Sequence, residues 1–485
     1  MSVDIPSDTT SDTPSDTPSP TSSRASREAA APPTSRPSTW AALRPLLLRL
    51  HFYAGVLIAP LLFVAAVTGL LYALSFQAEN VLYRHELRVP VGDATQPLTA
   101  QVAAAKAAHP EGYVTAVWPS PEEGATTRVL MKAPGLAEDE SLAVFVDPYT
   151  NEVRGALAST GSSGALPLRS WLSSFHADLK LGELGRNYSE LAASWLWVVA
   201  LGGLALWVGR RRRARLLRPE RGLTGRRRTL SWHGSVGLWA VVGLVLLSAT
   251  GLTWSRYAGE NIADLKDRLG GATPTVAAAT AGGMGGGHEH HEGMVMPPAA
   301  PSTLTLDQVA ETAREQGVRA GIQISLPSAG KGFVVRERDT EFPVHLDAVA
   351  IDPADGKVMD VLRFSDYPVL AQLTRFGIDA HMGVFLGLPN QLALAVLAVA
   401  LMALIVWGYR MWWQRRPTKG RALGVGRPQP RGAWRKVPLP VLLPLVAVTA
   451  LVGWFVPLLG ISLLAFLVID ALLGLRGRKK VVAAS

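Results

Sequence analysis

Six apolar runs, each long enough to cross a bilayer as a helix, constrain this chain most strongly. A transmembrane helix needs about 20 mostly apolar residues, because the hydrocarbon core of a membrane is about 30 Å thick. Backbone polar groups in lipid must also be satisfied internally, which favours helices. The predicted spans are 40–76, 190–209, 233–254, 386–409 and two within 437–476. We therefore expect a polytopic α-helical membrane protein.

Basic residues next to these spans predict the topology. Short basic loops stay in the cytoplasm, so the net charge of +10 reflects membrane sorting and does not indicate a nucleic-acid partner. The tail 1–39 is rich in Ser, Thr, Pro and Asp, which predicts disorder. The expected cytoplasmic segments are 1–39, 210–232, 410–436 and 477–485, and the expected outer segments are 77–189 and 255–385. Both termini are then cytoplasmic, and the Ala-, Gly- and Arg-rich composition suggests a bacterial plasma membrane.

Two halves of the chain repeat the same pattern. His51 and His233 each open an apolar span, and a glycine and a Thr-Gly-Leu triplet follow both at equal spacings. His176 and His381 each follow an Asp-Pro pair at equal spacing, and each precedes a Leu-Gly pair. This predicts a duplicated two-span repeat with the two C-terminal spans added outside it.

Each outer segment reads as a small α+β module. A helical pattern (98–110 and 304–317) precedes strand-like runs, and VDPYTNEV and IDPADGKV are hairpin signals. A module of about 60 residues has a thin core, so we expect it to lean on the membrane domain. The second copy is longer, and the insertion falls in the Gly/His/Met/Pro-rich stretch 270–300.

The four duplicated histidines are the candidate cofactor ligands. Imidazoles from helices are common axial ligands of haem. The chain contains no cysteine, which excludes a covalently attached c-type haem. The simplest arrangement is one haem b between His51 and His233 near the inner surface and a second between His176 and His381 near the outer surface. A proton relay or a metal path through the membrane is the alternative.

Two glycines are further candidates for contact with a bound cofactor. Gly69 and Gly251 lie about five helical turns after His51 and His233, so each faces the same way as its histidine. A glycine on that face gives a flat macrocycle room to approach the backbone. Ordinary packing of small residues between helices is the competing interpretation.

The insertion carries a second candidate metal site. Imidazole and thioether groups in a glycine-rich setting suit copper, and imidazole also suits iron. An idle low-complexity loop is the alternative. The candidate ligands are His288, His290, His291, Met294 and Met296.

The two C-terminal spans contain no histidine and a single carboxylate, Asp470. An acid inside a membrane is a functional candidate by default. Asp470 lies near the cytoplasmic end of its span, so we expect it to reach the interface toward Arg476.

Several stretches resemble the PepSY-associated transmembrane family, which includes siderophore-linked ferric reductases. The resemblance covers about 45–412 and rests on LRLHFYAG, TGLLYAL, VDPYTNEVRG, FHADLKLGELGR, SWHGSVGLW and IDPADGKV. It implies a four-span core, outer PepSY modules and, in reductase members, two b-type haems at the four boundary histidines. The His/Met insertion departs from that pattern and raises copper as the metal handled.

These observations favour a ferric or cupric reductase. Electrons would enter from a quinol or a cytoplasmic flavin donor, pass between two haems and reduce an extracytoplasmic metal complex. One alternative is a haem-free metal-binding or transport accessory that uses the insertion as a capture arm. Another is an envelope regulator built on the PepSY modules.

Overall fold

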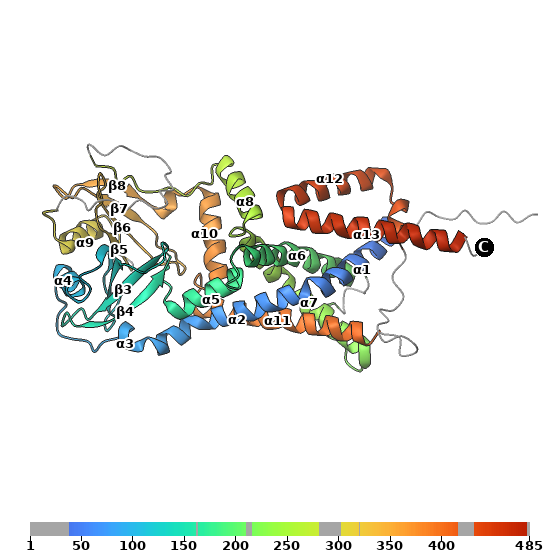
Figure 1. The fold of residues 1–485 in the computed structure, drawn as a ribbon, viewed down its shortest axis with the longest axis horizontal. Helices are drawn as coiled ribbons and strands as arrows, with labels where there is room; N and C mark the ends of the chain where they lie inside the picture. The colour runs from blue at the N-terminus through green and yellow to red at the C-terminus, as the bar shows by residue number, and fades with distance from the viewer. Residues whose placement is uncertain are drawn as a thin grey trace, which may run out of the picture.

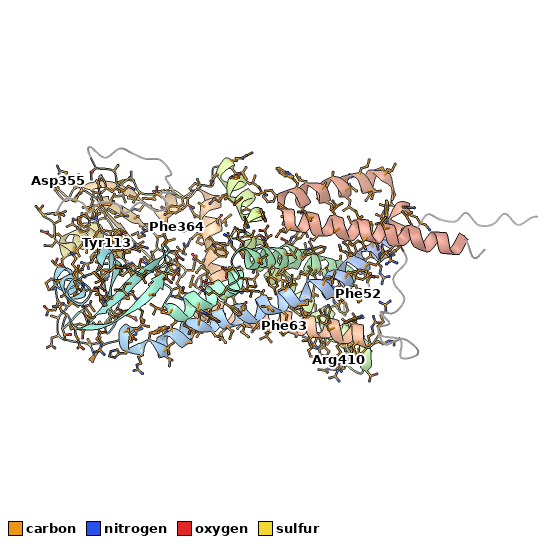
Figure 2. The ribbon with its side chains drawn as sticks, viewed as in Figure 1. Phe52, Phe63, Tyr113, Asp355, Phe364 and Arg410 are labelled. Atoms are coloured by element: carbon orange, nitrogen blue, oxygen red, sulfur yellow. The ribbon has the colours of Figure 1, made fainter. Side chains whose placement is uncertain are left out.

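The computed structural model describes residues 38–161, 163–209, 216–280, 302–319, 321–415 and 431–482. The molecule is elongated, with a β-sheet and its covering helices at one end and a bundle of long helices at the other (Figure 1). Tyr113 and Asp355 lie at the sheet end, and Arg410 lies at the opposite end (Figure 2). The long helices therefore connect two chemically different ends.

Five helices of the described chain are long and apolar enough to cross a membrane. Helix α12 is apolar but shorter, with 17 residues, so the two predicted C-terminal spans are one full-length helix and one short one. The five are α2 (Ala59–Leu82), α6 (Glu183–Val208), α7 (Gly225–Leu252), α11 (Leu388–Trp413) and Pro457–Leu475 of α13 (Pro457–Val482).

The first predicted span, 40–76, is two helices, α1 (Thr39–Leu57) and α2, that meet at Ile58. Pro60 sits in the first turn of α2 and has no N–H to donate to the carbonyl of Val56. The Tyr409 hydroxyl donates to that carbonyl at 2.8 Å. A side chain from α11 thus satisfies the backbone group that the proline leaves without its helical partner.

The strands form one eight-stranded antiparallel sheet with the order β4-β3-β2-β1-β5-β6-β7-β8. Each half of the chain contributes a four-stranded meander, and the halves join where β1 pairs with β5 through Ala116↔Ser325 and Val117↔Ile324. The strands are β1 (Tyr113–Trp118), β2 (Thr127–Lys132), β3 (Glu140–Val146), β4 (Val153–Thr160), β5 (Gln323–Ser325), β6 (Phe333–Arg336), β7 (Ala348–Ile351) and β8 (Val358–Leu362).

One hydrophobic core serves both meanders. Helices α4 (Leu98–Ala108) and α9 (Leu306–Glu315) cover the same face of the sheet and share a cluster of fully buried residues such as Val117, Val309 and Ile324. The two expected modules therefore pack against each other. This packing is favourable because either module alone would have a thin core. We call this unit, residues 88–160 and 302–362, the sheet domain.

Shorter helices connect the sheet domain to the long helices. Helix α10 stands between the sheet and the bundle, and α5 runs beside α2 (Figure 1). Helices α12 and α13 form a hairpin on one flank of the bundle, where α13 contacts α6 and α8. The connecting helices are α3 (Arg84–Leu87), α5 (Pro167–Asp178), α8 (Tyr257–Arg268) and α10 (Val369–Met382), and the hairpin is α12 (Leu439–Phe455) and α13.

Candidate functional site

The two histidines that open the repeated spans face each other in the bundle. His51 on α1 and His233 on α7 have ring centroids 6.4 Å apart, with the ring planes at 79°. His51 Nδ1 lies 3.1 Å from the carbonyl oxygen of Val199, and His233 Nδ1 lies 3.0 Å from that of Leu404. A carbonyl only accepts, so each Nδ1 carries the proton and donates it. Each Nε2 is then the unprotonated nitrogen that can bind a metal.

The second pair is built in the same way nearer the sheet. His176 on α5 and His381 on α10 have ring centroids 6.5 Å apart. Their Nδ1 atoms lie 2.8 Å from Thr68 Oγ1 and 2.7 Å from Thr250 Oγ1. We call these two arrangements the His51–His233 pair and the His176–His381 pair.

The threonine hydroxyls fix the same tautomer in the second pair. Thr68 Oγ1 donates to backbone oxygens one turn earlier, at 3.0 Å from Val64 and 3.1 Å from Ala65. Thr250 Oγ1 donates to the carbonyl of Leu246 at 2.7 Å. A hydroxyl has one proton, so each threonine oxygen accepts from the imidazole Nδ1–H. All four histidines therefore keep Nε2 for another ligand, and such partners orient metal-bound imidazoles.

The spacing within both pairs fits one metal ion held between two imidazoles. Bonds from metal to imidazole nitrogen are about 2.0 Å long, and the ring centre lies about 1.1 Å beyond that nitrogen. Two collinear axial imidazoles on a haem iron therefore have ring centres about 6.2 Å apart. The observed separations of 6.4 Å and 6.5 Å agree with this distance. The donor set thus fits bis-histidine haem at both levels.

Glycines lie against three of the four rings. A Cβ atom on Gly69 would meet His176 Cε1 at 3.2 Å, and one on Gly251 would meet His381 Cε1 at 3.4 Å. A Cβ on Gly203 would meet His51 Cε1 at 3.0 Å. Gly69 and Gly251 therefore adjoin the His176–His381 pair, and their role beside a macrocycle stays a prediction. Gly203 was not anticipated from the sequence.

The two pairs lie at different depths along the bundle. Thr68, which contacts His176, comes 17 residues after His51 on the α1–α2 segment. At a rise of about 1.5 Å per residue this corresponds to about 25 Å, most of the thickness of a bilayer core. The arrangement places one imidazole pair toward each end of the long helices.

A hollow of about 460 Å³ lies between α7 and α11, at the same end of the bundle as His233, and neither His51 nor His233 lines it. Trp232, the neighbour of His233, and Trp407 contribute their rings, which are 6.0 Å apart. Arg228 and Arg410 supply positive charge at its wall. Aromatic faces beside guanidinium groups suit a planar ligand that carries an anionic group.

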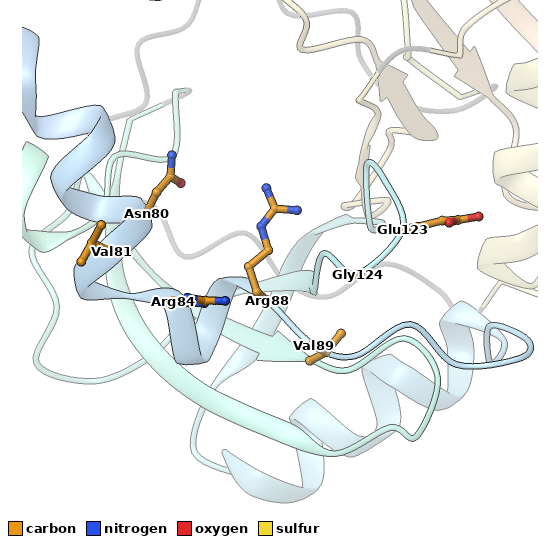
Figure 3. A pocket seen from close by; sticks show the side chains of 7 residues that line it. All are labelled: Asn80, Val81, Arg84, Arg88, Val89, Glu123 and Gly124. Carbon is orange, nitrogen blue, oxygen red and sulfur yellow. The ribbon is translucent and has the colours of Figure 1, made fainter.

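A second hollow, of about 490 Å³, contains none of the paired histidines. It lies where α2 ends and α3 begins, and Figure 3 shows Arg84, Arg88 and Glu123 among the residues that line it. Arg88 also forms an ion pair with Glu122 at 2.6 Å. This hollow is separate from the candidate cofactor sites.

The candidate ligands in the insertion, within 284–296, lie outside the described residues and remain a prediction. Residues 270–280 of the predicted insertion, however, are described. Ala277 N donates to Asp360 Oδ2, and Thr280 N donates to the carbonyl of Gly330. Residues 277–280 are thus hydrogen-bonded to the sheet domain. Within the described chain, no group of three His, Cys, Asp or Glu residues could hold a metal ion.

Comparison with known proteins agrees with this architecture. The family model "PepSY-associated TM region" matches residues 48–415. The chain belongs to this family. The PepSY-associated match includes all four paired histidines, whereas α12 and α13 lie beyond its end. No curated protein matches the chain. Family membership and the five apolar helices together make this a membrane protein.

The threonine contacts yield a first prediction. Replacing Thr68 and Thr250 by valine keeps the side-chain shape but removes the acceptor of each Nδ1–H. Removing the hydrogen-bond partner of a metal-bound histidine typically weakens metal binding by about 10–100-fold. We expect haem loss at the His176–His381 pair alone, measured as haem per chain after dialysis against apomyoglobin. Ser174→Ala, which removes an α5 hydroxyl bonded to the Ser170 carbonyl, is the control. Equal retention by all three proteins would contradict the assignment.

Proposed function

We propose that this PepSY-associated membrane protein is a di-haem b-type oxidoreductase that passes electrons across the membrane to an extracytoplasmic ferric or cupric complex. One observation carries the proposal: two imidazole pairs at different depths, each with Nε2 available and ring centres 6.4 Å or 6.5 Å apart. When bound, haem supplies reversible one-electron chemistry at its iron.

The histidines and their partners determine what such a site can do. Two axial imidazoles leave no open coordination position, which favours electron transfer over oxygen chemistry. The Val199 and Leu404 carbonyls and the two threonines hold the rings in place.

The two ends of the bundle suit input and output of electrons. At the His51–His233 end, the hollow with Trp232, Trp407, Arg228 and Arg410 suits a quinol or a flavin donor. At the other end the His176–His381 pair lies beside the sheet domain, where an acceptor metal complex would bind. A ferric-siderophore or a copper complex is the substrate class; the acceptor takes one electron and the donor supplies it.

The test is spectroscopic. Protein purified from haem-replete cells should show a Soret band and a pyridine haemochrome of two haems b per chain. Mixing the dithionite-reduced protein with ferric citrate should reoxidise both haems, with one Fe(II) formed per haem. Colourless, folded protein from such cells would refute the proposal.

A second function, metal capture without haem, is favoured by the His/Met-rich composition of the insertion. Replacing His288, His290, His291, Met294 and Met296 by serine keeps the loop length and the bonded residues 277–280. We expect unchanged haem content and at least a tenfold weaker affinity for Cu(I), measured by competition with bicinchoninate. If the wild-type protein contains no haem and the serine variant loses Cu(I) binding, the capture function would be favoured instead.

A further inference from the structure

The hollow between α7 and α11 lies where both helices reach their ends at one side of the bundle. Arg228 and Thr229 line it from the start of α7, and Arg410 lines it from the last turn of α11. Both helices are long and apolar enough to cross a membrane, so their ends are at the level of the lipid headgroups. Trp232 and Trp407 also line the hollow, and tryptophans are enriched at this level of a bilayer.

The two arginines bring positive charge that acidic side chains do not offset. Neither Arg228 nor Arg410 forms an ion pair with an Asp or Glu of the described residues, and no acidic residue of that part of the chain lines the hollow. Arg226 and Arg227 add like charges in the first turn of α7, where the helix dipole is also positive. Guanidinium groups bind phosphate oxygens through charge-assisted hydrogen bonds. A bound phosphate would therefore relieve the repulsion at this end of the helices.

The lining of the hollow is present in only one half of the duplicated chain. The halves correspond through the carbonyls that accept from the histidines, Val199 for His51 and Leu404 for His233. Counted from these residues, the second half has Arg228, Trp232, Trp407 and Arg410 where the first half has Leu46, Leu50, Gly202 and Ala205. A cofactor held in the same way by both halves does not account for this difference. The difference therefore indicates a ligand that only the second half binds.

Exposed apolar side chains continue from both arginines toward the middle of the bundle. Trp239 comes 11 residues after Arg228 on α7, and Val399 comes 11 residues before Arg410 on α11. This spacing is about three turns at about 3.6 residues per turn, so each apolar side chain is on the same face of its helix as the arginine. Trp239 and Val399 are both exposed. A ligand with a phosphate at the arginines and long apolar chains would fit along these two faces.

We infer that Arg228 and Arg410, with Trp232 and Trp407, bind the phosphate of an anionic phospholipid of the phosphatidylglycerol class. Basic pockets between membrane helices suit such headgroups. The choline or ethanolamine of a zwitterionic lipid would add a positive charge beside two arginines, which favours the anionic lipid. The lipid would support the start of α7, the helix that carries His233. This phosphate site does not require haem, so it goes beyond the proposed function. A flavin donor with a phosphate would present the same group, and the experiment separates the two sources.

The probe is dioleoylphosphatidylglycerol, added with an equal amount of dioleoylphosphatidylcholine to the full-length protein in detergent, and bound lipid is counted by native mass spectrometry. Losing charge-assisted hydrogen bonds should weaken binding of the anionic lipid by about tenfold or more in Arg228→Gln with Arg410→Gln. Arg228→Lys with Arg410→Lys should keep most of the wild-type preference for phosphatidylglycerol. The matched control is Arg226→Gln with Arg227→Gln, which removes the same charge from exposed positions that do not line the hollow.

Flavin mononucleotide and riboflavin, which lacks the phosphate, test the second source. Each is titrated into protein saturated with phosphatidylglycerol, and binding is followed by flavin fluorescence. We expect neither flavin to displace the lipid. Displacement by flavin mononucleotide alone, with an affinity that depends on Arg228 and Arg410, would assign the phosphate site to the electron donor and overturn the lipid assignment.

The remaining outcomes are distinct. No preference for phosphatidylglycerol in the wild type would overturn the phosphate site, and so would an equal preference in the Arg228/Arg410 glutamine variant and the Arg226/Arg227 control. A preference that depends on Arg228 and Arg410 in a protein that contains no haem would support the phosphate site and refute the proposed di-haem function.

Discussion

Replacing His51 and His233 together by alanine should remove one haem from each chain and leave the second in place. In the proposed function these two side chains would hold that haem, and their ring centroids are 6.4 Å apart. The partners that orient His176 and His381 are on other residues and stay intact. The pyridine haemochrome should therefore fall from two haems per chain to one. The complementary variant, His176→Ala with His381→Ala, should give the same stoichiometry, and the quadruple variant should bind none.

Two other histidines of the chain provide the control. His85 and His345 are exposed and belong to neither pair, so His85→Ala with His345→Ala should keep both haems. The spectra of the two half-variants should also differ, because the pairs differ in their Nδ1 partners, which are carbonyls in one pair and hydroxyls in the other. Loss of both haems from either half-variant in a protein that elutes as a folded species would contradict two independent sites.

The duplication was visible in the sequence because equal spacings survive at equal depths. It predicted four candidate ligands, whose role stays a prediction, and the family match over 48–415 confirmed the resemblance on which they rest. Pairing within the structure follows the simplest prediction, His51 with His233 and His176 with His381. Spacing alone was informative here because a helix converts residue number into height along the membrane normal.

The partners of the histidines were not predictable in the same way. Val199 and Leu404 act through backbone carbonyls, which carry no residue-type signal. Thr68 and Thr250 were visible as a repeated triplet, and that repetition was the signal that could have identified them. Their role depends on helices α5 and α10 folding back onto α2 and α7, which is a long-range contact.

The single sheet was missed for a related reason. Local patterns identify strands and hairpins, but the β1–β5 pairing joins Ala116 to Ser325, residues far apart in the sequence. From the local sequence alone, β1 and β5 are expected in two separate modules.

Asp470 has partners in the structure that differ from the one expected from the sequence. We expected it to reach the cytoplasmic interface toward Arg476, whereas the structure pairs it with Arg49 and Arg431. Arg49 Nε and Nη2 donate to the two carboxylate oxygens at 2.9 Å and 2.8 Å, a bidentate geometry. The side chains of Arg49 and Asp470 are 2% and 8% exposed. This ion pair fastens the α12–α13 hairpin to α1, beside His51.

Removing one member of this ion pair should therefore destabilise the protein strongly. Asp470→Asn removes the carboxylate charge that the buried Arg49 guanidinium binds in bidentate fashion, and breaking a buried pair from one side typically costs about 3–5 kcal/mol. We expect a markedly lower midpoint of thermal unfolding. Haem should be held more weakly at the His51–His233 pair than at the other, because the ion pair holds the α12–α13 hairpin to α1, the helix that carries His51. Haem content and melting curves of the same preparations measure both effects.

Replacing both partners distinguishes an uncompensated charge from lost packing. Arg49→Met with Asp470→Leu removes the two most buried charges together and leaves Arg431, whose side chain is 22% exposed, without Asp470. Apolar replacement of a buried ion pair is often neutral or stabilising. The double variant should therefore melt well above Asp470→Asn, even though it lacks the same hydrogen bonds. Asp355→Asn, at an exposed hairpin of the sheet domain, should melt like the wild type. If Asp470→Asn also melts like the wild type, Arg49 reaches water or another partner, and the hairpin is held to α1 by apolar packing alone.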